Sequence, residues 1–149
     1  MDTDKAGTKP EIGPEIETTK QLAALRQIAA AIEHLRKQEY ECAITLAAAA
    51  EGLLPPTDEW PMFSALKEDI PPEEFKYLDF NMVVNWLKHP HGPDPFLFLE
   101  SEAASLILRA ITKFIAVYYQ STKRMEQFLE WHSARYPVDL SVDSATNES

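Results

Sequence analysis

Polar side chains able to take part in chemistry are concentrated in one short segment of this sequence, residues 81–95. The segment contains Asn81, Asn85, Lys88, His89, His91 and Asp94. Asn85 and His89 are four residues apart, so on a helix they share one face, with Cβ atoms about 5–6 Å apart. Imidazole ordinarily titrates near neutral pH, which makes His89 a candidate general acid or base. Asn85 and Lys88 could then hold a phosphate or carbonyl oxygen.

The same segment is also compatible with a purely structural role. A histidine near the last carbonyls of a helix is favoured by the helix dipole, and Asn85 would then simply be solvated. Asn81 and Asp94 are further candidates for ligand binding. So is Glu51, which follows a run of alanines and, if it faces inward, needs a cationic or amide partner. Lys88 or Asn85 would supply that partner.

Several other kinds of site are disfavoured by the sequence. His89, His91 and Asp94 are metal-ligand types, but two intervening prolines restrict how they converge. Cys42 is the only cysteine, and its place on an apolar helix predicts a buried, inert thiol. The four glycines are too widely spaced for a phosphate-binding loop, and no zinc-binding His-Glu-x-x-His occurs. The sequence therefore predicts no metal and no cofactor.

Length and charge indicate one acidic, cytoplasmic domain. The chain has 149 residues and a net charge of −10, with an acidic segment at each end. No basic stripe is present of the kind that binds nucleic acid non-specifically or recruits a protein to an acidic membrane. A single cysteine fits a reducing compartment. No apolar run approaches the ~20 residues that cross a bilayer.

Hydrophobic periodicity predicts an all-α protein. Residues 1–17 and 137–149 are expected to be disordered arms, and residues 18–136 a single domain. Apolar residues recur at helical spacing in every predicted element, without a strand pattern. The expected architecture is an antiparallel bundle of four main helices plus one or two short ones. The helices are predicted at 18–37, 39–53, 61–68, 71–89, 101–120 and 121–135, with Thr18, Ser101 and Ser121 or Thr122 at helix starts.

The polar segment also carries a family resemblance. Asn85-Trp86-Leu87-Lys88-His89, followed by Asp94-Pro95, lies between an alanine-rich helix at 43–54 and Phe128-Leu129-Glu130-Trp131. This order resembles a family of uncharacterised small bacterial proteins with an Asn-aromatic-x-Lys-His segment leading to Asp-Pro. The resemblance covers residues 20–132 and implies a helical fold but no established activity.

A helical bundle with a polar residue leading to a histidine is also similar to the HEPN superfamily. Those domains are dimeric, and many are metal-independent RNA endonucleases that use an arginine followed a few residues later by a histidine. The resemblance implies that His89 is the acid/base. No arginine precedes His89 at that spacing, and three residues separate Asn85 from it and seven separate Asn81. Neither asparagine therefore replaces the missing arginine.

Two hypotheses of different classes follow. The first is a non-enzymatic, homodimeric helical module that binds a protein or small ligand through the Asn81–Asp94 surface, with Tyr118, Tyr119 and Trp131 at the subunit interface. The second is a metal-independent endoribonuclease of toxin or defence type, with His89 as acid/base and RNA as its partner. In that reading Asn85, Lys88 and Asn81 position the phosphate. Neither hypothesis involves a membrane.

Overall fold

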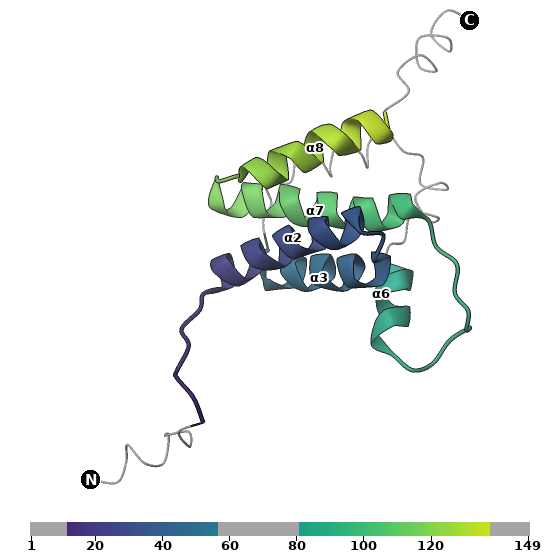
Figure 1. Cartoon of the computed structure of the whole chain (residues 1–149), viewed down its shortest axis with the longest axis horizontal. Helices are drawn as coiled ribbons and strands as arrows, with labels where there is room; N and C mark the ends of the chain where they lie inside the picture. Colours follow the sequence, from purple (N-terminus) through teal and green to yellow (C-terminus); the bar gives the residue numbers. More distant parts are fainter. Residues whose placement is uncertain (1–11, 57–80, 138–149) are drawn as a thin grey trace, which may run out of the picture.

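A computed structural model describes residues 12–56 and 81–137, and within these ranges helix is the only regular secondary structure (Figure 1). The prediction of an all-α bundle with four main helices and a short one is confirmed. The predicted helix at 61–68, the first part of the predicted helix at 71–89 and the outer parts of both arms lie outside the described residues. The helices are α2 (Lys20–Arg36), α3 (Tyr40–Leu53), α6 (Asn81–Lys88), α7 (Glu100–Tyr118) and α8 (Lys123–Arg135).

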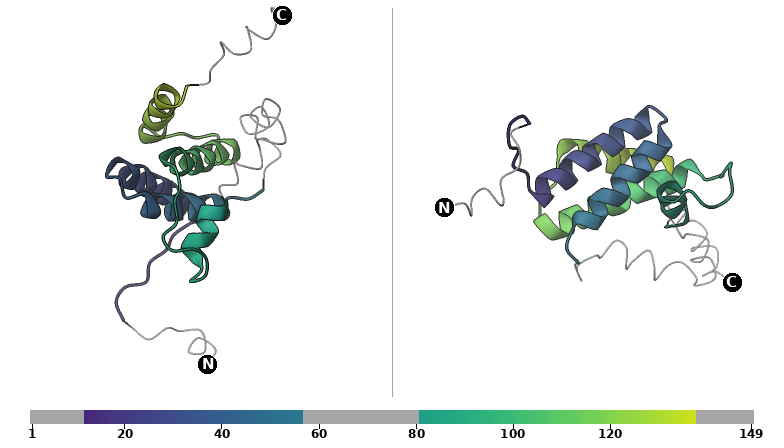
Figure 2. Two further views of the ribbon diagram at one scale, coloured as in Figure 1. Left: turned by 90° about the vertical axis from the view of Figure 1, so that its right-hand side faces the viewer. Right: turned by 90° about the horizontal axis from the view of Figure 1, so that it is seen from below.

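The helices are arranged around a layer formed by α2, α3 and α7. Helices α2 and α3 form an antiparallel hairpin whose turn contains Gln38 in the left-handed conformation, with φ 62°. Helix α7 packs against both, and α8 returns antiparallel to α7. The short helix α6 contacts α3. Figures 1 and 2 show α6 and α8 on opposite sides of this layer.

Two threonine caps begin α2 and α8. The Thr19 Oγ1 accepts a hydrogen bond from the Leu22 amide at 3.1 Å, and the Thr122 Oγ1 accepts one from the Met125 amide at 3.1 Å. Each cap satisfies an amide that has no partner within its helix. Of the two predicted starts of the last helix, Ser121 and Thr122, the structure has Thr122 as the cap, whereas the cap of α2 is Thr19, one residue later than the predicted Thr18.

Helix α7 begins earlier than predicted. Its N-terminal cap is Leu99, not Ser101, and the Leu99 amide donates to the Glu102 carboxylate at 2.7 Å. Glu102, at the third helical position, therefore accepts a hydrogen bond from the amide of the cap residue, as a glutamate does in a capping box. The hydroxyl that completes a capping box is absent, because the cap residue is a leucine. The helix ends at Tyr119, which is left-handed with φ 54° and donates its amide to the Ile115 carbonyl at 2.8 Å.

Small side chains fill much of the core. Eight alanines are completely buried, and they let α2, α3 and α7 approach closely. The largest fully buried side chain is Phe114 of α7. The predicted burial of Cys42 was wrong, because Cys42 lies on the exposed face of α3. Leu22 of α2, whose spacing matches the buried stripe of that helix, is also 36% exposed. The buried alanines are Ala24, Ala31, Ala43, Ala47, Ala50, Ala103, Ala104 and Ala110.

None of the described helices combines the length and the apolar character needed to cross a membrane.

Candidate functional site

The predicted polar segment lies on α6 and the loop that follows it. Val83 and Val84 are buried, which fixes the opposite face of α6 toward solvent. The six candidate polar residues of the segment are all exposed. The helix ends at Lys88, so His89 is the first residue beyond it rather than part of its last turn. Asn85 therefore lies in α6, whereas His89, its predicted neighbour on the same helix face, lies just beyond the end of the helix.

The loop after α6 is held by the side chain of Trp86. Its indole Nε1–H donates a hydrogen bond to the Pro93 carbonyl at 2.6 Å, and its ring stacks on Phe96 with centroids 5.3 Å apart. Gly92 has φ +113°, and a Cβ atom there would lie 3.1 Å from Trp86 Cδ1. A side chain at position 92 would therefore suffer both backbone strain and crowding. Trp86 is therefore an anchor for the loop.

The exposure of this segment limits the chemistry it can perform alone. Interactions of Asn85, Lys88 and His89 with a charged group are weakened by water, because the local dielectric constant is high. Among the residues in the described ranges, no three His, Cys, Asp or Glu side chains gather closely enough to hold a metal ion. Such a surface can offer hydrogen bonds, one lysine charge and two imidazoles to a partner that supplies the remaining wall of the site.

Glu51 does not belong to this surface. Its carboxylate accepts a hydrogen bond from Arg109 Nε at 2.8 Å, and the side chains are only 15% and 19% exposed. Lys113 Nζ donates to the Glu51 backbone carbonyl at 3.2 Å. The prediction that Lys88 or Asn85 would be its partner is therefore wrong. Glu51 joins α3 to α7 in a mostly buried ion pair.

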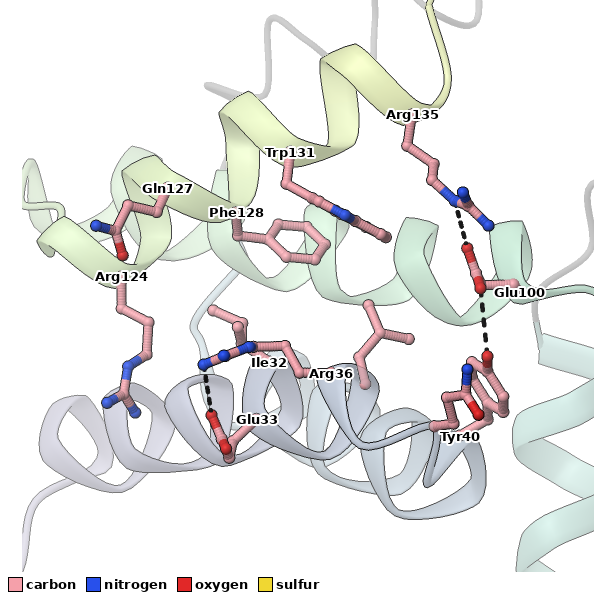
Figure 3. A pocket seen from close by; sticks show the side chains of 12 residues that line it. Ile32, Glu33, Arg36, Tyr40, Glu100, Arg124, Gln127, Phe128, Trp131 and Arg135 are labelled. Atoms are coloured by element: carbon pink, nitrogen blue, oxygen red, sulfur yellow. Dashed lines mark hydrogen bonds and ion pairs between the residues drawn. The ribbon is translucent and has the colours of Figure 1, made fainter.

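A second surface, not foreseen from the sequence, lies between α2 and α8. A cleft of about 660 Å³ lies there. It is lined by aromatic, aliphatic and charged side chains (Figure 3). Three arginines and two glutamates line it. Helix α8 contributes Arg124, Phe128, Trp131 and Arg135, spaced so that they share one face of the helix. That spacing was the one available signal, but it does not reveal which helix α8 faces. We call this feature the α2–α8 cleft.

The charges in the α2–α8 cleft are unequally satisfied. Arg36 pairs with Glu33 at 3.3 Å, and Arg135 pairs with Glu100 at 2.9 Å. Arg124 makes no hydrogen bond or ion pair with any other group in the part of the chain that the structure describes. Its side chain points from α8 toward α2 in Figure 3. The cleft therefore has one guanidinium available to an incoming anion.

One end of the cleft is closed by a cluster around Glu100. Its carboxylate accepts hydrogen bonds from the Tyr136 and Tyr40 hydroxyls and from Arg135 Nε. The bonds from Tyr136 and Arg135 hold the pKa of the Glu100 carboxyl below its ordinary value, because they favour the charged form. This cluster joins the C-terminal end of α8 to the starts of α7 and α3. Residues so far apart in sequence leave no local signal.

Comparison with known protein families, with functionally described proteins and with solved structures finds no match for this chain. The two resemblances stated from the sequence therefore stay predictions.

Proposed function

We propose that this chain is a non-enzymatic, homodimeric binding module whose Asn81–Asp94 surface recognises a partner protein or small ligand. The observation that carries the proposal is the combination of exposed polar side chains with a loop held by Trp86. Asn85, Lys88 and His89 face solvent, while the hydrogen bond from Trp86 to Pro93 fixes the loop beside them. A surface already held in its binding conformation loses less conformational entropy when a partner binds.

Exposure favours recognition over catalysis at this surface. A general acid or base gains most from a site that excludes water and aligns it with the reacting atoms. His89 lies in solvent just beyond the end of α6, and no arginine precedes it at the spacing of the HEPN endonucleases. Apolar exposure is also consistent with association, since Met82 beside Asn81 is 61% exposed and Leu97 is 91% exposed.

The proposal is tested by replacing the polar groups without disturbing the fold. The double variant Asn85→Ala/His89→Ala should lose capture of the partner from a source-cell extract, measured by quantitative mass spectrometry. The matched control, Glu130→Ala/Ser133→Ala, changes two exposed residues of α8 and should retain capture. Equal melting temperatures would show that both variants are folded. Unchanged capture by the first variant would contradict the proposal.

The conformation of the loop can be tested separately. Gly92→Ala leaves Asn85 and His89 in place but introduces a Cβ against Trp86 at a positive φ. It should therefore weaken capture in the same direction as the double variant. Ala134→Gly, an exposed change elsewhere on the surface, controls for general effects of handling.

Two further measurements address the other parts of the proposal. A chain that sediments as a monomer at micromolar concentration would contradict the dimer. Degradation of RNA in EDTA by the wild type, abolished by His89→Ala, would replace the binding module with the endoribonuclease hypothesis, in which His89 is the acid/base. Growth inhibition on expression would point the same way.

A further inference from the structure

The α2–α8 cleft differs in charge from the rest of the chain. The whole chain has a net charge of −10, yet the cleft is lined by three arginines and two glutamates. Glu33 and Glu100 are already paired with Arg36 and Arg135, so Arg124 carries the surplus positive charge. Trp131, two turns further along α8, is 39% exposed. The cleft thus combines an available guanidinium with accessible aromatic surface, which suits an acidic segment that also carries apolar side chains.

A segment of that chemistry precedes α2 in this same chain. Residues 12–19 contain neither helix nor strand, and Ile12 and Ile16 are 88% and 86% exposed. Ile12 precedes a bend at Gly13, whose φ is +93°. Beyond this bend Pro14 and Ile16 share one face of an extended backbone, because side chains alternate between its two faces. Glu15 and Glu17 lie on the other face, and no basic residue occurs between positions 11 and 19. We call residues 12–19 the N-terminal arm.

We infer that the N-terminal arm of one copy of this chain docks in the α2–α8 cleft of a second copy. Ile12 and Ile16 would contact the apolar lining around Phe128 and Trp131, and a carboxylate of Glu15 or Glu17 would pair with Arg124. Exposed isoleucines at two positions of one arm are unfavourable in a free monomer, because their apolar surface stays in water. Docking removes this surface from water and neutralises the unpaired guanidinium.

The geometry of the arm favours a second copy over its own cleft. Ile16 can lie at most about 14 Å from Lys20, since four extended residues span about 3.6 Å each. Ile32, the first residue of α2 that lines the cleft, lies about 18 Å along the helix from Lys20 at 1.5 Å per residue. Ile16 therefore falls short of Ile32, which belongs to the α2 side of the apolar lining, within its own chain. In Figure 1 the arm also leads away from the bundle.

Exchange of arms between two copies gives a closed assembly. Each copy offers one arm and one cleft, so two reciprocal contacts related by a two-fold axis use every docking element once. The Asn81–Asp94 surface lies with α6 on the opposite side of the α2–α3–α7 layer from α8 (Figure 2). The two surfaces can therefore be occupied together. Arm exchange rests on the dimer of the proposed function, so a monomeric chain contradicts both, whereas loss of partner capture at the Asn81–Asp94 surface leaves arm exchange unaffected.

Charge reversal tests the pairing in the full-length chain. Arg124→Glu and, separately, Glu15→Lys/Glu17→Lys should each raise the dimer dissociation constant by about tenfold or more in sedimentation velocity. The chain with all three changes should recover the wild-type constant, because the opposite charges again face each other. Lys123→Glu, an equal charge change at the neighbouring exposed position outside the cleft lining, should leave the constant unchanged. A monomeric wild type, or a dimer insensitive to these reversals, would overturn the inference.

Disulfide trapping separates exchange between copies from docking within one chain. In a Cys42→Ser background, copies with Glu17→Cys are mixed with copies with Gln127→Cys, which lines the cleft. A disulfide-linked pair with one copy of each kind is expected under mild oxidation. Failure of this pair to form would overturn the inference. So would a chain carrying both cysteines that forms only an internal disulfide while staying monomeric.

Discussion

Two contacts between helices in this bundle are built on different side chains. Helices α3 and α7 bury several small side chains, with Ala47, Ala50 and Ala110 completely buried. Between α2 and α8 they are large, with Phe128 and Trp131 on α8, and a cleft of about 660 Å³ remains. The size of side chains at a contact sets how closely two helices approach. Helices that approach closely leave no room for a ligand between them, whereas the wider contact between α2 and α8 leaves that room.

The ion pairs at the two contacts also differ in how far their side chains are exposed to water. Glu51 and Arg109 join α3 to α7 with 15% and 19% of their side chains exposed. Glu33 and Arg36, at the edge of the α2–α8 cleft, are 41% and 75% exposed. Water screens the second pair and leaves its members free to exchange partners, while the first pair is held in a low dielectric. We therefore expect structural consequences from one pair and few from the other.

The largest effect is expected from breaking the buried pair. Arg109→Met should lower the free energy of unfolding by about 3 kcal/mol, because it leaves the Glu51 carboxylate buried without its partner. Urea denaturation followed by circular dichroism measures this loss. The matched change in the exposed pair, Arg36→Met, should cost less than about 1 kcal/mol. Equal losses in the two variants would contradict the distinction between the two contacts.

A second substitution distinguishes pairing from packing at the same place. Adding Glu51→Leu to Arg109→Met removes the orphaned charge and should recover most of the lost stability, because both partners are then apolar. A double variant that is as unstable as Arg109→Met alone would show instead that the arginine acts mainly through its packed methylene groups.

The next effect concerns the alanines. Ala47→Leu should destabilise the fold by about 2 kcal/mol, since extra methylene groups in a closely packed contact force the helices apart. Ala49→Leu is the matched control, because Ala49 lies on the exposed face of the same helix. Thermal melts of both variants provide the measurement. If Ala47→Leu were tolerated as well as Ala49→Leu, the contact would be less tightly packed than its buried alanines indicate.

A smaller effect is expected where Glu100 holds α8. Glu100→Gln should cost about 1 kcal/mol, because it weakens the hydrogen bonds from Tyr136 and Arg135 to a charged acceptor. Hydrogen exchange should increase in α8 before it increases in α3. Since the folded-state pKa of Glu100 is lowered, its contribution is present above the ordinary glutamate pKa and is lost as pH falls through the folded-state value. Glu130→Gln, exposed on α8, is the control; an α8 exchange rate equal to that control would contradict the role of Glu100.

Local patterns predicted the local structure of this chain. Periodicity predicted the helix that contains the buried Ile28, Ile32 and Leu35, and Thr122, one of two predicted starts, is the cap of α8. Both signals act over a few residues. The predicted start of α7 at Ser101 was wrong. The Ser101 hydroxyl is a plausible cap in the sequence, but the group that caps the helix is the side chain of Glu102, which lies inside it.

Features built from distant residues were missed for a physical reason. The partner of Glu51 is Arg109, 58 positions away, and nothing in either helix alone specifies that pairing. The composition of the sequence indicated the Asn81–Asp94 surface. The loop of that surface, however, is held by the hydrogen bond from the Trp86 indole to the Pro93 carbonyl, which the composition does not reveal. The exposure of Cys42 was misjudged because Ala43 and Ile44, which follow it, are buried apolar residues, while Cys42 itself faces away from the core. Tertiary packing decides each of these.

The smallest expected effect tests how well α8 covers its own side of the bundle. Burial lowers the pKa of His132, whose ring lies 5.3 Å from that of Tyr136 and 6.0 Å from that of Phe128. The unfolded chain therefore takes up a proton at a higher pH than the folded chain, so stability should decline as pH falls below the ordinary histidine value of about 6.5. His132→Gln should match the wild type near pH 7.5 in urea denaturation and lose less stability between pH 7 and pH 5. An identical pH dependence in the two proteins would show that His132 is protonated as readily in the folded chain as in the unfolded one. In that case α8 would leave this ring in contact with water.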